Sequence, residues 1–471
     1  MTAFAGFGKK LKTFVFDNIA TLIFILFVLT GLCVSANLSL ESFMNELLAR
    51  FFRNGLLVLS LIIPITAGLG FNFGIVVGAL AGMLSLITTR YLAQLDTLAH
   101  LTWFGGFSGI MFSFLLALPL AALFGLLTGK LYNKTRGQEM IASLIVCYFA
   151  TGLYQFIVLY AIGGIIPVPA LHRMIKPDGI GILASFDMGP HPASRLFDPE
   201  TGKPGLSYAL DWIWRAPFPT VLVTITLCML GFIMIRRMRA KNDSALSALI
   251  HVHHDNANCM ICIVLLVLGL HGAFFPDGIG FIPVSPIKNI GKIPVVTGSV
   301  ILAVCLFIHY FSGTKLGQDC RSIGRSRHIA EVSGIDVDRT RIIATMISMV
   351  LASWGMIIFL QNTGSVSTYT SQEQVGMSSV AALLAGGATT SKASVKNALI
   401  GLFLFHSMYI VSPYIGRLFS GSEGIGEFMR LFMQYGVIVL ALVLHIWKGR
   451  KAVGNIESVR KAGTTILTSD S

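Results

Sequence analysis

The chain has 471 residues, of which 54% are hydrophobic and only 12% are charged, and its net charge is +13. A soluble domain carries about 25% charged residues, so this composition excludes an ordinary soluble globular protein and indicates a membrane protein. The Lys and Arg residues flank the apolar runs and form no basic stripe with interleaved aromatic residues, which argues against nucleic-acid binding.

An apolar run over about 17–36 is the first predicted span, and Lys9, Lys10 and Lys12 precede it. This run of about 20 residues is long enough to cross a membrane, and it is longer than the roughly 7–15 residues of a signal-peptide core. We therefore predict a cytoplasmic N-terminus over 1–16, followed by a transmembrane domain over 17–447.

The next apolar region, about 54–90, is too long for one span and contains the uncharged, glycine-rich sequence 68–74. We predict two helical segments that meet at this break. Asn72 lies in it, and a polar side chain at mid-membrane depth needs either a partner or a water-lined path. Beyond the break, glycines recur every four residues, at Gly74, Gly78 and Gly82. This spacing predicts a helix face that another helix approaches closely.

Further spans are predicted over about 105–131, 139–163 and 216–235, and the last of these ends in the basic sequence 236–241. Basic residues mark the cytoplasmic side of a membrane protein. The Pro- and Gly-rich stretch 164–215 is therefore predicted to be an extracytoplasmic insertion, which either contacts a partner protein or is simply a long loop.

Histidines and cysteines gather in one short segment, at His251, His253, His254, Cys259 and Cys262. Two interpretations are open, a zinc site and a solvated juxtamembrane loop. Because the cysteines open an apolar span and their spacing matches no established zinc pattern, we favour the loop and predict no metal site.

The C-terminal half carries apolar runs over about 293–312, 341–360, 376–412 and 428–447, with a basic tail over 448–471 that is predicted to be cytoplasmic. The run 376–412 is interrupted by the sequence 386–392, so each half of the chain holds one glycine-broken hydrophobic hairpin. Corresponding breaks in two halves point to a transport pathway between structural repeats. We predict an all-α polytopic membrane protein with about ten transmembrane helices plus glycine-broken half-helices, in two related halves.

The most polar stretch of the chain, 317–339, carries charges of both signs between two long apolar runs. Lipid does not solvate such charges, and the excess of Arg places the stretch in a cytoplasmic loop over 313–341.

A short amphipathic helix is predicted in this loop from Arg325 to Ser333, with Gly334 as its C-cap. Its apolar stripe consists of Ile329, Ala330 and Val332. Such a helix either docks on a soluble partner or belongs to an ordinary solvated loop.

Ile323-Gly324, Ala330 and the run Ser-Gly-Ile-Asp-Val-Asp-Arg over 333–339 closely resemble the cytoplasmic signature of bacterial ABC importer permeases. The family serves ribose-type sugars, branched-chain amino acids and nucleosides, and its loop forms a coupling helix that sits in a groove of the ATP-binding subunit. The resemblance covers about 54–447. It implies that the ATPase-coupling residues are Arg325, Ala330, Glu331, Ser333 and Gly334.

Three shorter sequences resemble patterns of this family. The first two resemble patterns of its nucleoside-type members, and the third resembles a pattern of the family in general. Phe71-Asn72-Phe73-Gly74 matches a Phe-Asn-x-Gly pattern, although the acidic and Gln residues that usually follow it are absent. Gln138-Glu139 is close to an Asn-Glu pattern, and the break at 386–392 resembles a Gly-Gly-Thr-type turn. The resemblance implies a substrate path that includes Phe71, Asn72, Glu139, Thr389 and Thr390. Glu139 has a second interpretation, as an acidic residue that complements a helix dipole.

The resemblance implies the permease subunit of an ABC importer in the bacterial inner membrane, with both termini in the cytoplasm. Its expected partners are an ATP-binding cassette ATPase that carries ATP and Mg, a second permease chain in a homodimer or heterodimer, an extracytoplasmic substrate-binding protein and membrane lipid. Nucleosides are the favoured cargo, followed by ribose-type sugars and riboflavin.

The sequence contains no acceptable phosphate-binding loop, nucleophile elbow or His-Glu-x-x-His motif. We therefore predict that the chain is not an enzyme, has no catalytic residues and holds no cofactor. The alternative function is an ion-coupled secondary transporter, which usually places ionisable residues at mid-membrane depth. The predicted spans are almost free of such residues there, which argues against this alternative.

Overall fold

A computed structural model describes residues 19–34, 38–94, 105–135, 137–167, 174–189, 205–240, 245–274, 287, 290–420, 424–439 and 443. The chain divides into two compact units. The first comprises Met1–Asn37, Ala49–Leu210 and Val300–Ser471, and the second comprises Leu38–Leu48 and Asp211–Ser299.

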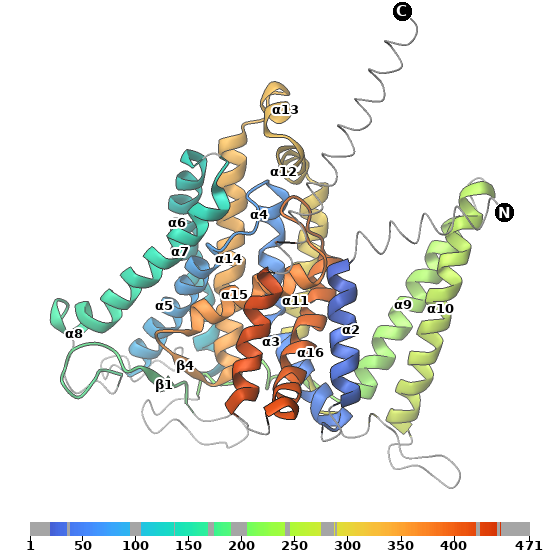
Figure 1. The fold of residues 1–471 in the computed structure, drawn as a ribbon, viewed down its shortest axis with the longest axis horizontal. Helices are drawn as coiled ribbons and strands as arrows, with labels where there is room; N and C mark the ends of the chain where they lie inside the picture. Colours follow the sequence, from blue (N-terminus) through green and yellow to red (C-terminus); the bar gives the residue numbers. More distant parts are fainter. Residues whose placement is uncertain are drawn as a thin grey trace, which may run out of the picture. The chain divides into compact units, whose positions relative to one another are not determined.

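The first unit is a bundle of helices (Figure 1). Its elements in chain order are α2 (Ile19–Val34), the second part of α3 (Leu40–Ser60), α4 (Ile62–Thr66), α5 (Ile75–Gln94), α6 (Gly106–Lys134), α7 (Glu139–Phe156), the π-helix η3 (Ile157–Ala161), α8 (Ile162–Gly164), β1 (Ser185–Asp187), the second part of α11 (Val295–Gly313), α12 (Lys315–Arg325), α13 (Arg327–Val332), α14 (Val337–Thr363), β4 (Ser365–Ser367), α15 (Ser371–Ala385) and α16 (Val395–Ser420). A further helix covers 424–439.

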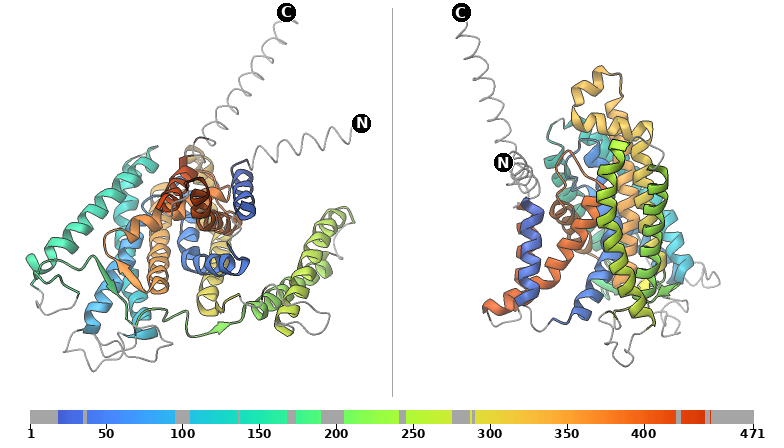
Figure 2. Two further views of the ribbon diagram at one scale, coloured as in Figure 1. Left: turned by 60° about the horizontal axis from the view of Figure 1, so that its bottom comes forward. Right: turned by 90° about the vertical axis from the view of Figure 1, so that its right-hand side faces the viewer.

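The second unit contains β2 (Arg215–Ala216), α9 (Phe218–Ala240), α10 (Ala245–Phe274) and β3 (Ile293–Pro294), with the first parts of α3 and α11. α9 and α10 run side by side (Figure 2), and β2 pairs antiparallel with β3. The backbone over 251–255 is part of α10, so the predicted juxtamembrane loop is wrong there. The side chains over 236–258 lie outside the described ones, and the described residues contain no group of three or more His, Cys, Asp or Glu placed to hold a metal.

Among the described residues, 8 helices are long and apolar enough to cross a membrane, and two shorter apolar helices cover Thr21–Cys33 and Cys259–Phe274. The chain is therefore an all-helical polytopic membrane protein, as predicted. One span begins at Leu40, well before the predicted start near residue 54, and it includes Arg50 and Arg53. The predicted span begins after these two arginines because charged residues are expected to lie outside the membrane. A helix bundle, however, can hold cations that are shielded from lipid.

α14 packs along α5 and α6 within the first unit, and small residues allow the close approach. A Cβ atom at Gly78 would lie 2.9 Å from the Met349 carbonyl oxygen, and one at Gly82 would lie 2.3 Å from the Ser353 carbonyl oxygen. The predicted close approach is confirmed at Gly78 and Gly82, with α14 as the neighbour, whereas Gly74 precedes α5 and meets Tyr132 of α6.

Both predicted glycine breaks are present. In the first, between α4 and α5, Gly68 and Gly70 have φ angles of +75° and +69°, which glycine adopts without steric cost. In the second, between α15 and α16, the Asn397 side-chain amide donates a hydrogen bond of 2.8 Å to the Gly386 carbonyl oxygen. Glycines with positive φ angles thus allow the turn in the first break, and a side-chain hydrogen bond stabilises the second.

α14 connects the two ends of the first unit (Figure 1). At one end are α12 and α13, and at the other β1 pairs antiparallel with β4, with Phe186 opposite Val366. The 27 residues of α14 separate these ends by about 40 Å at 1.5 Å per residue. Part of the predicted insertion 164–215 is thus an ordered element attached to the far end of α14.

Candidate functional site

The polar stretch 317–339 folds into two short helices, not into the single helix predicted from Arg325 to Ser333. α12 ends at Arg325, and Ser326 follows with an extended backbone (φ −159°, ψ 113°). The Ser326 hydroxyl oxygen accepts a hydrogen bond from the Ile329 backbone N–H and so caps α13. A serine at this position starts a new helix because it satisfies an otherwise unpaired N–H group.

α13 ends in a Schellman motif, and Gly334 supplies its left-handed residue with φ +78°. The Ile335 N–H donates to the Ala330 carbonyl and the Gly334 N–H donates to the Glu331 carbonyl, both at 3.1 Å. Ser333 is the C-cap residue. The predicted helix end at Gly334 is confirmed.

The predicted stripe of Ile329, Ala330 and Val332 is divided between two faces of α13. Ala330 is 1% exposed and packs with Ile323 and Val337, so it holds α13 against α12 and α14. Ile329 and Val332 are 66% and 76% exposed. The structure corrects the placement of Ala330 on the exposed face and leaves two uncovered apolar side chains in a charged loop.

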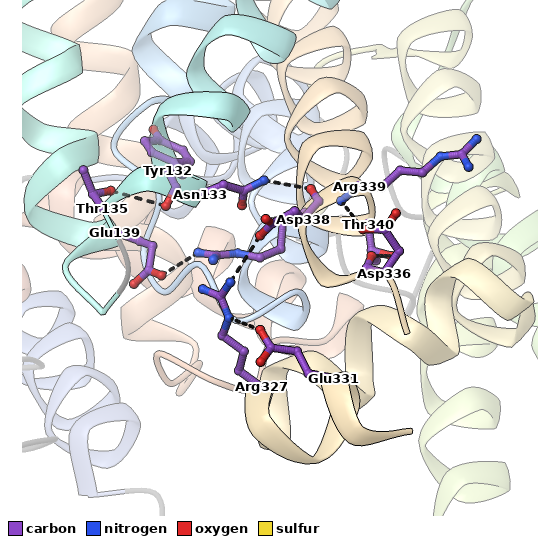
Figure 3. A network of polar contacts seen from close by, with 11 residues as sticks. Tyr132, Asn133, Thr135, Glu139, Arg327, Glu331, Asp336, Asp338, Arg339 and Thr340 are labelled. Carbon is purple, nitrogen blue, oxygen red and sulfur yellow. Dashed lines mark hydrogen bonds and ion pairs between the residues drawn. The ribbon is translucent and has the colours of Figure 1, made fainter. Parts of the chain in front are cut away.

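Arg327 is the centre of an ion-pair network at the base of α13 (Figure 3). Its Nε lies 2.8 Å from Glu331 Oε1, and its Nη2 lies 3.2 Å from Asp338 Oδ1. These groups are partly exposed, so each pair contributes at most about 1 kcal/mol. Together they tie α13 to the first turn of α14. Arg327 was not among the predicted residues, although its four-residue spacing from Glu331 is a recognisable signal.

The first turn of α14 has two further polar anchors (Figure 3). Asp336 caps the helix by accepting a hydrogen bond of 3.0 Å from the Arg339 N–H. The Asn133 side-chain amide, at the end of α6, donates to the Asp338 carbonyl oxygen at 2.8 Å. The loop that follows α13 is thus fixed to α6 as well as to α14.

A buried ion pair joins α14 to α7. Arg341 Nη2 lies 2.6 Å from Glu139 Oε1, and the two side chains are 2% and 14% exposed. Loss of one partner would leave the other charge buried, so the pair fixes the start of α7 against α14. Glu139 was predicted to lie on a substrate path, and the structure gives it Arg341 as a partner. The two residues are 202 positions apart, and no local sequence signal links them.

A cavity of about 460 Å³ lies beside these two ion-pair systems. Its lining residues are Gly68, Gly137, Glu139, Ile323, Arg327, His328, Glu331 and Arg341. The cavity therefore lies where the first glycine break, the start of α7 and the helices α12 to α14 meet.

The first glycine break touches the end of α12 directly. A Cβ atom at Gly324 would lie 2.4 Å from the Thr66 carbonyl oxygen, and one at Gly68 would lie 3.2 Å from the Gly324 Cα atom. No larger residue fits at either glycine without displacing backbone. The end of α12 and the first break are therefore in direct backbone contact.

Phe71 and Asn72 are buried in the first break. Asn72 Oδ1 accepts hydrogen bonds from the Tyr132 hydroxyl at 2.8 Å and from the Gly74 N–H at 2.9 Å, and its Nδ2 is buried without a hydrogen-bond partner. Tyr132 belongs to the last turn of α6, next to the residue that bonds α14. Asn72 thus links the first break to the last turn of α6, and its place on a transport path at mid-membrane depth stays a prediction.

Thr389 and Thr390 lie half-buried in the second break, as predicted. The Thr389 N–H donates to the Lys392 carbonyl at 2.9 Å, and the Lys392 N–H donates to Thr389 Oγ1 at 3.1 Å. These bonds close the turn between α15 and α16. Contact of the two threonines with a cargo stays a prediction.

A bundle of membrane-length helices, broken by glycine turns and braced at one end by a compact charged loop, defines the class of polytopic membrane proteins. Comparison with known families matches residues 201–444 to the model for the "Branched-chain amino acid transport system / permease component" family. The chain belongs to this family, which is of the ABC importer permease type.

The matched region includes the polar stretch and the second break, and it begins after the first break and Glu139. Transmembrane components of this family are not enzymes, and the family implies an ATPase and a binding protein as general partners. No curated protein and no solved structure matches the chain.

Proposed function

We propose that this chain is one of two permease chains, identical or related, of an importer in the bacterial inner membrane. It moves a small polar solute inward while a separate ATPase subunit hydrolyses ATP with its Mg. A binding protein delivers the cargo at the β1–β4 end, and both termini lie in the cytoplasm. Family membership supports the transport role, and the charged loop supports the orientation.

The observation that carries the proposal is the pair of exposed apolar side chains on α13. Ile329 and Val332 have no cover within the described chain, although the rest of the loop is charged. We infer that a groove of the ATPase covers them, with Arg325 and Glu331 contributing charged contacts at the edge. Because α13 is braced on α12 and α14, a push on it reaches the first glycine break through the Gly324 contact.

Nucleosides are the proposed cargo on the strength of the Phe71-Asn72 and Gln138-Glu139 patterns, with ribose-type sugars and riboflavin next. Asn72 and Glu139 have partners within the chain, Tyr132 and Arg341. Because both side chains already have partners, they are not free groups that could bind a cargo. They support the proposal because they help to arrange the chain around the first break.

Cross-linking tests the docking surface. The variants Ile329→Cys and Leu302→Cys are each co-expressed with an ATP-binding subunit encoded by a neighbouring gene and treated with a short bismaleimide. Leu302 is 60% exposed on α11 and is a matched control within a membrane span. We expect a cross-link to the ATPase from position 329 only. Equal cross-linking from both positions, or none from 329, contradicts the proposal.

A secondary transporter is the second candidate, and one observation favours it. Arg50 and Arg53 lie inside the span Leu40–Thr66, whereas the sequence interpretation placed almost no charge at mid-membrane depth. Membership in the permease family weighs more heavily for an ATP-driven importer. Uptake by the chain without an ATPase decides between the two.

A further inference from the structure

We propose that a polar cavity at the β1–β4 end of α14 receives a lysine or arginine side chain of the binding protein, with the Asp187 carboxylate as its counter-charge. This inference rests on the proposed function and specifies where, and with which charge, that partner is held. The cavity has a volume of about 460 Å³, and its polar lining includes Ser185, Asp187, Ser207 and Ser365.

The cavity lies beyond the membrane spans, at the end of α14 opposite to α13 (Figure 1). The span Val337–Thr363 ends at the cavity wall with Thr363, and the other lining residues belong to no candidate span. The length of α14 separates the cavity from the exposed side chains of α13 by about 40 Å. A protein that contacts the cavity therefore approaches from the side opposite to the proposed ATPase surface.

One wall of the cavity belongs to a strap, residues 174–189, that is bonded to two different parts of the first unit. The Ile182 N–H donates a hydrogen bond of 2.9 Å to the Val158 carbonyl in η3, and the Tyr369 hydroxyl donates one of 2.9 Å to the Ile182 carbonyl. β1 of the strap pairs with β4. These bonds hold the strap in one conformation, and a preorganised surface loses little conformational entropy when a partner binds.

The backbone around the cavity is also held in an unusual conformation. Gly189, Tyr208 and Gly364 all line the cavity and have φ angles of +97°, +52° and +78°. Tyr208 is the one non-glycine residue with a positive φ in the described part of the chain, and its N–H donates to the Gln361 carbonyl at 2.7 Å. Such a conformation is unfavourable for a bulky side chain, and residues of this kind cluster at binding sites.

The charge of the lining suits a cation. Among the described residues that line the cavity, Asp187 has the one charged side chain. Its Oδ1 accepts a hydrogen bond of 3.2 Å from the Gly189 N–H, and the described chain provides it with no ion-pair partner. The second carboxylate oxygen is therefore available to a cation from another molecule, whereas an anion would be repelled.

The pairing of β1 with β4 places hydroxyl groups around this carboxylate. Asp187 lies directly opposite Ser365, and Ser185 lies two residues away on the same face of β1. Ser185 and Asp187 are exposed, whereas Phe186 between them is buried. Lys and Arg side chains carry only hydrogen-bond donors, so a carboxylate flanked by hydroxyl oxygens offers them suitable acceptors.

Titration with the purified binding protein tests the cavity without the ATPase. The full chain in lipid nanodiscs is titrated with the binding protein encoded by a neighbouring gene, at low and at high ionic strength. Asp187→Asn removes the charge and keeps an Oδ1 acceptor for the Gly189 N–H, so its Tm should equal that of the unaltered chain. Asp178→Asn is the matched control, because Asp178 is an exposed carboxylate of the same strap that does not line the cavity.

We expect Asp187→Asn to raise the Kd about 10-fold at low ionic strength, because it leaves the partner's cation without its counter-charge. The difference should shrink at high ionic strength, because salt screens the interaction in the unaltered chain. Asp178→Asn should leave the Kd unchanged. An equal Kd for Asp187→Asn and the unaltered chain, or a tighter complex with Asp187→Asn, overturns the proposal.

A second pair of variants tests the cavity by its volume. Ser365→Trp should fill the cavity and raise the Kd, whereas Ala184→Trp adds the same bulk at an exposed position of the strap outside the cavity and should not. Equal effects of the two variants contradict the proposal. If the unaltered chain binds and neither Asp187→Asn nor Ser365→Trp weakens the complex, only the cavity fails. If the unaltered chain does not bind, the delivery step of the proposed function fails with it.

Discussion

Truncation of the two exposed side chains of α13 tests docking quantitatively. Ile329 and Val332 are 66% and 76% exposed, so Ile329→Ala with Val332→Ala should lower the free energy of unfolding by only about 1 kcal/mol. On docking, the exposed fractions become buried at about 0.8 kcal/mol per CH₂ group, so the double substitution should remove about 3 kcal/mol of binding free energy. This loss corresponds to roughly a 100-fold rise in Kd.

The assay titrates the permease in lipid nanodiscs with the purified ATP-binding subunit. Leu306→Ala is the matched control, because Leu306 is 60% exposed on α11, and it should bind with the affinity of the unaltered chain. An unchanged Kd for the double variant, with the variant correctly folded, would refute the docking surface.

Four further predictions concern the structure around this surface. Ala330→Leu places a larger side chain in the packed cluster with Ile323 and Val337, so the free energy of unfolding should fall by about 1–3 kcal/mol. The Tm should fall with it, and an unchanged Tm contradicts this packing. Arg341→Met leaves Glu139 buried without its partner and should lower the free energy of unfolding by about 3–5 kcal/mol. Adding Glu139→Gln should restore much of the lost Tm, and the absence of any recovery argues against the ion pair. Burial raises the pKa of the Cys320 thiol to about 12, with the Asp319 carboxylate adding to the shift, so the reactive thiolate is scarce at neutral pH. N-ethylmaleimide should therefore leave Cys320 unlabelled in the folded chain at neutral pH and label it after denaturation, and fast labelling of the folded chain is the contrary result. Gly334→Ala should cost about 1 kcal/mol in thermal unfolding because φ is +78°, and a stabilised variant contradicts the Schellman assignment.

The sequence was sufficient for the fold class and for both glycine breaks. Span length and hydrophobicity report directly on the bilayer, and glycine runs such as 68–74 interrupt helices for local steric reasons. The four-residue spacing of Gly78 and Gly82 also predicted close helix packing correctly, although only the structure shows that α14 is the neighbour.

The candidate site was predicted in position but not in detail. A single helical phase was assumed from Arg325 to Ser333, whereas the Ser326 cap begins a new helix and turns Ala330 inward. Helical periodicity cannot show which face of a short helix meets the rest of its own chain.

Charged residues with distant partners were the least predictable feature. Arg341 pairs with Glu139 across 202 positions, and Arg50 and Arg53 lie within a span that hydropathy places further along the chain. Their placement depends on shielding by several helices at once, which no window of sequence contains.

ATP-driven uptake in vesicles tests the central claim most directly. The chain is reconstituted alone and with its ATP-binding subunit, and uptake of radiolabelled uridine, ribose and leucine is followed with ATP or with an imposed ion gradient. We predict uptake of a cargo only with both subunits and ATP, and its loss in the variant carrying Ile329→Ala and Val332→Ala. Uptake by the chain alone that follows an ion gradient and is indifferent to ATP would contradict the account.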